Sequence, residues 1–306
     1  MINYYCPGFV EAQPIYNVLL SLYKQAPQCF YENVKIKKIF GNFPNMIWNG
    51  GTVWFGPTLA RQEVIEYFNW YAYQDVTLQL ICTNPVLEEQ DVHDRYCNMV
   101  LDIASQFSFV EILVSSPLLE SHIRSKYPHM KVTKSIVGTT SMVGTAQDTI
   151  EDYMRLLEQY DAIVLPKKYG KDLEALKTIP QELRSRIEIL ATDPCPNNCP
   201  HLYSHYQDYG RTQLGIMPPP AVGYCYGVDN SIPFRHWVNR HCQYNYTQLT
   251  EVLEPLGFTE IKLSGRGNAA HVCFSIIPYL IKPEYLMDVF TLVMAPHCKS
   301  IMDPVF

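Results

Sequence analysis

Short apolar runs alternate with amphipathic stretches along this 306-residue chain, and that alternation constrains its fold more than any other feature. The runs are rich in β-branched and aliphatic residues, and between most of them apolar residues recur every three or four positions, as in helices. The eight runs are Lys35–Gly41, Thr52–Gly56, Thr77–Asn84, Phe109–Pro117, Lys131–Thr139, Ala162–Lys168, Arg186–Asp193 and Glu260–Arg266. Strands that alternate with helices pair in parallel, and eight such units favour a closed (β/α)8 barrel of the TIM type.

Two connections depart from a regular barrel. The link between the first two runs, residues 42–51, is too short for a crossover helix, so we expect the barrel to be irregular there. Residues 194–259 form a long connection between strands seven and eight that is rich in Cys, His and Pro. We expect this insertion to cross the C-terminal mouth of a single barrel domain spanning residues 1–306.

Composition narrows the class of protein. A net charge of −6 argues against a strongly basic nucleic-acid surface, although it is compatible with a local basic groove. The first residues lack the basic region and apolar run of a signal peptide, and no apolar stretch is long enough to cross a membrane. Ten cysteines without an export signal favour reduced thiols and a cytoplasmic location.

Polar residues stand where most of the expected strands end. In barrels of this type the reacting groups come from the carboxyl ends of the strands and the loops that follow. The polar residues at these ends are Asn42, Asn84, Ser115, Ser116, Thr139, Lys167, Lys168, Asp193 and Arg266. Turn formation explains many such residues singly, but their convergence on one rim indicates a site.

A glycine-rich turn, "SGRGNAAH", follows the eighth run. Gly265 and Gly267 lie between a strand and an expected helix, where free backbone N–H groups can bind an anion. Arg266 adds a forked cation between them. The same residues also fit an ordinary helix start capped by Ser264 or Asn268. We predict that Gly265, Arg266 and Gly267 bind a phosphate or carboxylate group.

The stretch "DPCPNNCPHLYSHY" places two thiols between prolines directly after the seventh run. Cys195 and Cys199, with two histidines one helical turn apart, could supply four zinc ligands, but within eleven residues such a site is cramped. An iron–sulfur cluster needs four thiolates, and Cys225 and Cys242 in the same insertion complete the set. Inert loop thiols are the remaining interpretation.

The other cysteines divide into two groups. Cys82 and Cys97 fall on a strand and on a helix face, so we expect them in the core. Cys6, Cys29 and Cys273 stay open as further ligands.

The cysteine stretch and the later "LGFTEIKLSGRG" resemble the peptidase U32-like family. Its members show an acidic residue or asparagine, a C-x-x-x-C-P stretch ending in His-Tyr, and a later strand similar to "GI…FKIEGR". The matching residues are Asp193, Cys195, Cys199, Pro200, His205, Tyr206, Gly257, Phe258, Lys262, Gly265 and Arg266. The resemblance is specific over the last third of the chain and otherwise covers only the barrel architecture. Ser264 replaces the family's Glu, and we expect no counterpart of the extra C-terminal domain of longer members.

The resemblance implies a [4Fe–4S] cluster, with zinc as the alternative metal. It also implies oxygen-independent hydroxylation, or a related redox modification, of a small molecule or an RNA base. The expected metal ligands are Cys195, Cys199, Cys225 and Cys242.

Three further residues are predicted to act in catalysis. His205 and Tyr206 would relay protons, because a histidine titrates near neutral pH. Arg266 would hold an anionic group of a small-molecule or nucleic-acid substrate. Two alternatives stay open: a U32-type peptidase, against which the absence of H-E-x-x-H and G-x-S-x-G motifs counts, and a non-catalytic metal-stabilised subunit with a protein partner.

Overall fold

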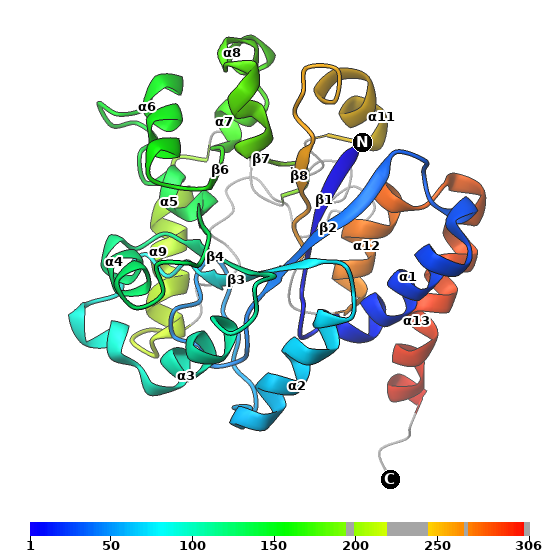
Figure 1. Ribbon diagram of the computed structural model, residues 1–306, viewed down its shortest axis with the longest axis horizontal. Helices are drawn as coiled ribbons and strands as arrows, with labels where there is room; N and C mark the ends of the chain where they lie inside the picture. The colour runs from blue at the N-terminus through cyan, green and yellow to red at the C-terminus, as the bar shows by residue number, and fades with distance from the viewer. Residues whose placement is uncertain (194–198, 219–243, 266–268, 303–306) are drawn as a thin grey trace.

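A computed structural model describes residues 1–193, 199–218, 244–265 and 269–302. Within these residues eight parallel strands close into a barrel in sequence order (Figure 1). Closure is direct, because Asn3 on the first strand lies opposite Glu260 on the last. The strands are β1 (Ile2–Pro7), β2 (Val34–Gly41), β3 (Thr77–Cys82), β4 (Val110–Val114), β5 (Val132–Lys134), β6 (Ala162–Val164), β7 (Ile187–Leu190) and β8 (Glu260–Lys262). The prediction of a closed (β/α)8 barrel is confirmed.

Helices cover the outer face of the barrel, and α1, α12 and α13 pack together on one flank (Figure 1). The helices in the described residues are α1 (Gln13–Gln25), α2 (Arg61–Ala72), α3 (Arg95–Ala104), α4 (Pro117–Lys126), α5 (Ile136–Thr140), α6 (Ile150–Arg155), α7 (Lys167–Gly170), α8 (Leu173–Thr178), α9 (Leu202–Gln213), α11 (Tyr246–Gln248), α12 (Ala269–Leu280) and α13 (Leu286–Met302). Short 3-10 turns lie at Pro27–Cys29, Glu89–His93, Leu156–Glu158, Gln181–Arg186 and Pro283–Tyr285, and a π-helical turn at Leu249–Leu253. Several helices begin at a side-chain cap, as at Asp94, Ser116 and Thr149.

The sequence-based strand assignment is wrong for two whole segments, and the run at Lys131–Thr139 is a strand only at Val132–Lys134, because Ile136–Thr140 forms α5. Ile2–Pro7 forms β1, although its Asn, Tyr and Cys residues hide the apolar pattern of a buried strand. Thr52–Gly56 forms no strand, and lies in the connection from β2 to α2, where Phe55 is 55% exposed. The backbone N–H of Trp54 in this loop donates to the Gln213 side chain instead of to a neighbouring strand. With β1 counted, a normal crossover helix follows β2, and the expected irregularity at residues 42–51 disappears.

The outward-facing strand residues form the main core against the helices. On β1 these residues are Ile2, Tyr4 and Cys6, none of which is exposed. Aromatic rings fill the space behind the first strands, where Phe9 meets Phe43 edge-on at 5.2 Å between ring centroids. This apolar shell fixes the strand positions and therefore the positions of the residues at the strand ends.

The barrel interior has two layers of different character. Nearer the carboxyl ends of the strands lies an apolar layer, which α5 and α9 help to close. Its members are Tyr5, Phe40, Ile81, Leu113, Ile136, Val137, Val164, Leu202 and Tyr206. Inward-facing residues alternate along a strand, and in most of the strands the inward residue two positions before the apolar one is polar. The half of the interior nearer the amino ends of the strands is therefore charged.

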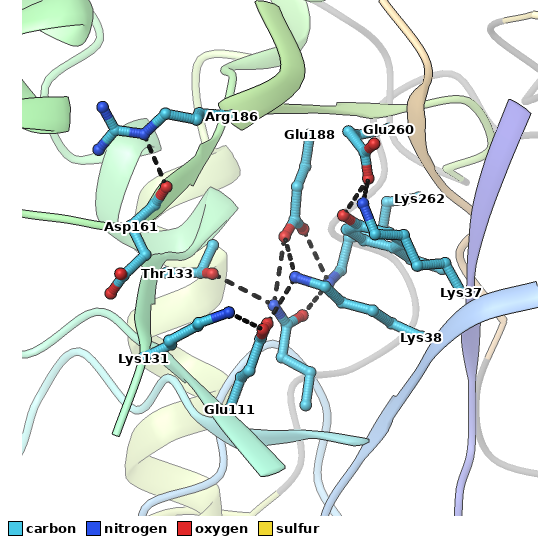
Figure 2. Close-up of polar contacts among 12 residues, drawn as sticks. Lys37, Lys38, Glu111, Lys131, Thr133, Asp161, Arg186, Glu188, Glu260 and Lys262 are labelled. Atoms are coloured by element: carbon cyan, nitrogen blue, oxygen red, sulfur yellow. Dashed lines mark hydrogen bonds and ion pairs between the residues drawn. The ribbon is translucent and has the colours of Figure 1, made fainter. Parts of the chain in front are cut away.

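Figure 2 shows this lower layer, a network of buried ion pairs inside the barrel. Glu188, which is 1% exposed, lies between two ammonium groups, at 3.3 Å from Lys262 Nζ and 3.7 Å from Lys38 Nζ. Lys38 Nζ also lies 2.6 Å from a carboxylate oxygen of Glu111. Gln79 connects the network, since its Nε2 donates to Glu188 and its Oε1 accepts from Lys262. The positive and negative groups therefore compensate one another inside the barrel.

Candidate functional site

Helix α9 lies at the C-terminal mouth of the barrel. Leu202 and Tyr206 are one helical turn apart, and both pack into the apolar layer with residues such as Phe40 and Leu113. Cys199, three residues before the helix begins, packs against the same cluster. The chain segment after β7 therefore closes the barrel axis and brings a thiol to its mouth.

Two polar side chains hold α9 in place. Asn84, at the end of β3, donates through Nδ2 to the carbonyl oxygen of Gly210, at 3.1 Å. Gln213 accepts from the backbone N–H of Trp54 at 2.8 Å, which ties the helix to the β2–α2 loop. The close approach at Asn84 requires glycine, because a Cβ atom at position 210 would lie 2.3 Å from Asn84 Oδ1. Two separate hydrogen bonds, through Asn84 and Gln213, therefore hold α9 at the mouth of the barrel.

The predicted metal ligands fall largely outside the described residues. Cys195, Cys225 and Cys242 lie in segments that the structure does not describe, whereas Cys199 is a half-buried free thiol at the mouth. In the described part of the chain, no three His, Cys, Asp or Glu side chains lie close enough together to hold a metal ion. The four-cysteine ligand set therefore stays a prediction with one member placed at the mouth.

Four of the five remaining described cysteines are buried and therefore poor thiolate ligands. Cys82 and Cys97 are fully buried, as predicted for core residues. Cys6 is also buried, and burial raises the pKa of its thiol well above the ordinary value. Burial raises the pKa of Cys273 to about 12. Cys29 is half-buried just before β2, at the opposite end of the barrel from the mouth.

The predicted proton-relay residues are neighbours on α9 but differ in environment. Tyr206 is 8% exposed and belongs to the apolar layer. His205 is half-buried and stacks on Tyr209, with 4.5 Å between ring centroids. Burial lowers the pKa of His205, and Asp208 opposes that shift only partly. A neutral imidazole is therefore favoured at neutral pH, where it can accept a proton.

A buried ion pair joins the ends of β6 and β7. Lys167 Nζ lies 2.5 Å from Asp193 Oδ1, and their side chains are 1% and 11% exposed. The sequence indicates both residues only as polar strand ends, and does not predict that they pair. A hydrogen bond also joins the ends of β7 and β8, because the backbone N–H of Ser264 donates to Thr192 Oγ1 at 2.7 Å.

The predicted anion-binding turn is described only at its first residue. Gly265 is buried, and a Cβ atom there would lie 2.7 Å from Ser275 Oγ on α12 and 3.3 Å from Pro7. Close packing against α12 therefore explains this glycine without a ligand. Arg266 and Gly267 lie outside the described residues, so the anion site itself stays a prediction.

Several other polar residues that the sequence predicts at strand ends have structural partners, and two of them, Thr139 and Lys168, lie in the helices α5 and α7 instead. Ser115 Oγ donates to the carbonyl oxygen of Thr83, and Ser116 caps α4. Thr139 Oγ1 donates to the carbonyl oxygen of Val164, and Lys168 pairs with Asp148. These residues shape the rim rather than offering free groups to a ligand.

Fold and site together define a (β/α)8 barrel whose C-terminal mouth carries a helix, a thiol and a buried ion pair. No protein-family model matches the sequence, and no curated protein matches it. The structure of the U32 peptidase Mk0906 is similar, with a TM-score of 0.52 and 14% sequence identity, over 88% of this chain and 94% of that one. At this identity the similarity shows a U32-like fold. None of the helices described is both long and apolar enough to span a membrane.

Proposed function

We propose that this protein is a U32-like enzyme that uses an iron–sulfur cluster at the barrel mouth. Its reaction would be an oxygen-independent hydroxylation, or a related redox modification, of a small molecule or an RNA base. The observation that carries the proposal is the position of Cys199. A C-x-x-x-C-P stretch follows β7, and its second thiol packs against the apolar layer that closes the barrel.

Thiolates suit a cluster and zinc alike, and the resemblance to the U32-like family is what favours the cluster. Cys199 is a free thiol at the mouth, and burial makes Cys6 and Cys273 costly to ionise. Four thiolates are the ligands of a [4Fe–4S] cluster, and the proposed set supplies that number. The proposed ligands are Cys195, Cys199, Cys225 and Cys242. When bound, the cluster would supply electron transfer or a ligation site for substrate.

The residues around Cys199 favour chemistry at the mouth. Leu202 and Tyr206 fill the barrel axis below it, so a substrate would approach from the outer side of α9. His205, whose pKa is lowered by burial, would accept a proton from the substrate or from water. Exclusion of water by the apolar layer would strengthen each electrostatic contact made there.

Anaerobic purification tests the proposal. We expect brown protein with a broad charge-transfer absorption and stoichiometric iron and acid-labile sulfide. The colour should bleach in air. A U32-type peptidase would instead be colourless and cleave peptides, so a colourless preparation without iron or sulfide that hydrolyses a peptide library would contradict the proposal in favour of that alternative. A brown preparation that binds no small molecule or RNA would support a non-catalytic partner subunit.

A further inference from the structure

The buried lysines in the described residues are not equally well satisfied. Lys38, Lys134, Lys167 and Lys262 are each 8% exposed or less. Three of them have at least two oxygen partners each. These partners are Glu111 and Glu188 for Lys38, the Ser115 carbonyl and Tyr160 hydroxyl oxygens for Lys134, and Gln79 and Glu188 for Lys262. Lys167 is the exception.

Among the described residues, Lys167 has a single partner. Its Nζ forms an ion pair with Asp193 at 2.5 Å, and no described residue provides a hydrogen-bond acceptor of good geometry. An ammonium group carries three N–H donors. A buried N–H group that makes no hydrogen bond costs free energy. The other three buried lysines in the described residues reduce this cost through their oxygen partners. The Lys167 ammonium therefore retains donor capacity that no described residue uses.

The location of these unused donors points to a ligand. In the described residues, the buried side-chain nitrogens that lack a hydrogen-bond acceptor are Asn42 Nδ2 and Lys167 Nζ. Asn42 directly follows β2, and Lys167 begins α7 three residues after the end of β6. Both donors therefore lie at the carboxyl ends of strands, where barrels of this type bind their ligands.

We propose that Lys167 binds an oxyanion of the substrate, a carboxylate or a phosphate of a small molecule, at the β6–β7 side of the mouth. Asp193 orients the ammonium and, as a neighbouring carboxylate, opposes a second negative charge. Binding of a bare anion is consequently weak in the wild-type protein and limited by Asp193. The inference rests on the proposed function only for what happens to the bound molecule, because anion binding needs no cluster.

Isothermal titration calorimetry of the full-length protein tests this site, with sodium phosphate and sodium acetate as separate probes. Ionic strength is held constant, because screening would otherwise mimic a loss of affinity. We expect Lys167→Met to weaken binding at least about tenfold. Asp193→Asn should tighten binding several-fold, since the competing carboxylate is gone. The better of the two probes identifies the oxyanion.

Lys168→Met is the matched control, because this neighbouring lysine of α7 pairs with Asp148 instead. Its affinity should stay within about twofold of wild type. If Lys167→Met does not fold, as judged by circular dichroism, the Asp193→Asn result decides alone. Equal affinity in wild type and Lys167→Met, or no binding by wild type and Asp193→Asn, overturns the proposal. Titrations of iron-free and iron-loaded protein separate this failure from failure of the cluster assignment.

Discussion

Glu188 is the residue on which the barrel interior depends most. Its carboxylate lies between Lys38 and Lys262 (Figure 2), and all three side chains are 8% exposed or less. Removing one member of a buried ionic group leaves the others uncompensated in a medium of low polarity. We predict that Glu188→Gln lowers the free energy of unfolding by about 3 kcal/mol, measured by urea denaturation.

An exposed ion pair provides the control for this prediction. Glu174 pairs with Lys177 on α8, but its side chain is 83% exposed. Glu174→Gln should change the free energy of unfolding by less than about 0.5 kcal/mol, because water solvates both charges. If the two substitutions cost the same, the interior network does not stabilise the barrel in the manner described.

The same carboxylate predicts how stability depends on pH. Burial alone would raise the pKa of Glu188, but Lys262 and Lys38 outweigh burial and hold it below the ordinary value of 4.5. A carboxyl group with a depressed pKa stabilises the fold above its unfolded pKa, and this contribution is lost as pH falls through its folded pKa. The stability difference between wild type and Glu188→Gln should therefore stay constant from about pH 7 to about pH 5 and shrink below 4.5. Urea unfolding at a series of pH values measures it, and an undiminished difference at about pH 3 would count against the assignment.

Among the helices, α9 is held at the mouth of the barrel by a particularly close contact. Gly210 lies inside this helix, where Ala is normally favoured by about 1 kcal/mol. Here the added Cβ would lie 2.3 Å from Asn84 Oδ1 and 3.0 Å from Val86. We predict that Gly210→Ala destabilises the protein by about 1–3 kcal/mol, measured by thermal or urea unfolding.

Gly170 on α7 is the matched control, since an added Cβ would lie 3.8 Å from Ile189, an ordinary contact distance. Gly170→Ala should be neutral or slightly stabilising. A stabilising effect of Gly210→Ala would mean that α9 does not press against the end of β3.

Most elements could be predicted from the sequence, and the errors arise where the composition of a segment does not match its burial. The run at residues 52–56 has the composition of a strand, but strand propensity reflects burial and neighbouring strands. This run is half-buried or exposed, and it pairs with no strand of the described barrel. The opposite holds for Ile2–Pro7. Tyr4 and Cys6 are buried in a strand, but the composition of this segment does not indicate one. The charged interior of the barrel is also visible in the sequence, because apolar strands such as "VEILV" and "IEIL" each contain one charged residue. In a parallel strand that is covered on both faces, such a charge must have a partner.

At the scale of the whole molecule, sequence order predicts which side chains share the mouth but not which of them pair. Cys199, His205 and Asp193 lie at the end of the barrel where their positions after β7 place them. The contact between Lys167 and Asp193 depends on the barrel closing with β6 beside β7, which no local pattern contains. The similarity to a solved U32 peptidase extends over most of both chains, so it supports the architecture rather than a particular substrate.

The proposed function requires the thiols at the mouth to hold an iron–sulfur cluster. Iron and acid-labile sulfide in anaerobically purified Cys199→Ser, compared with Cys29→Ser, test it most directly. Both residues are half-buried thiols, but Cys29 lies at the opposite end of the barrel. We predict that Cys29→Ser retains wild-type iron and sulfide, whereas Cys199→Ser loses most of both while keeping the circular dichroism of the folded barrel. Equal iron and sulfide in the two variants, or none in the wild-type protein, would contradict the account.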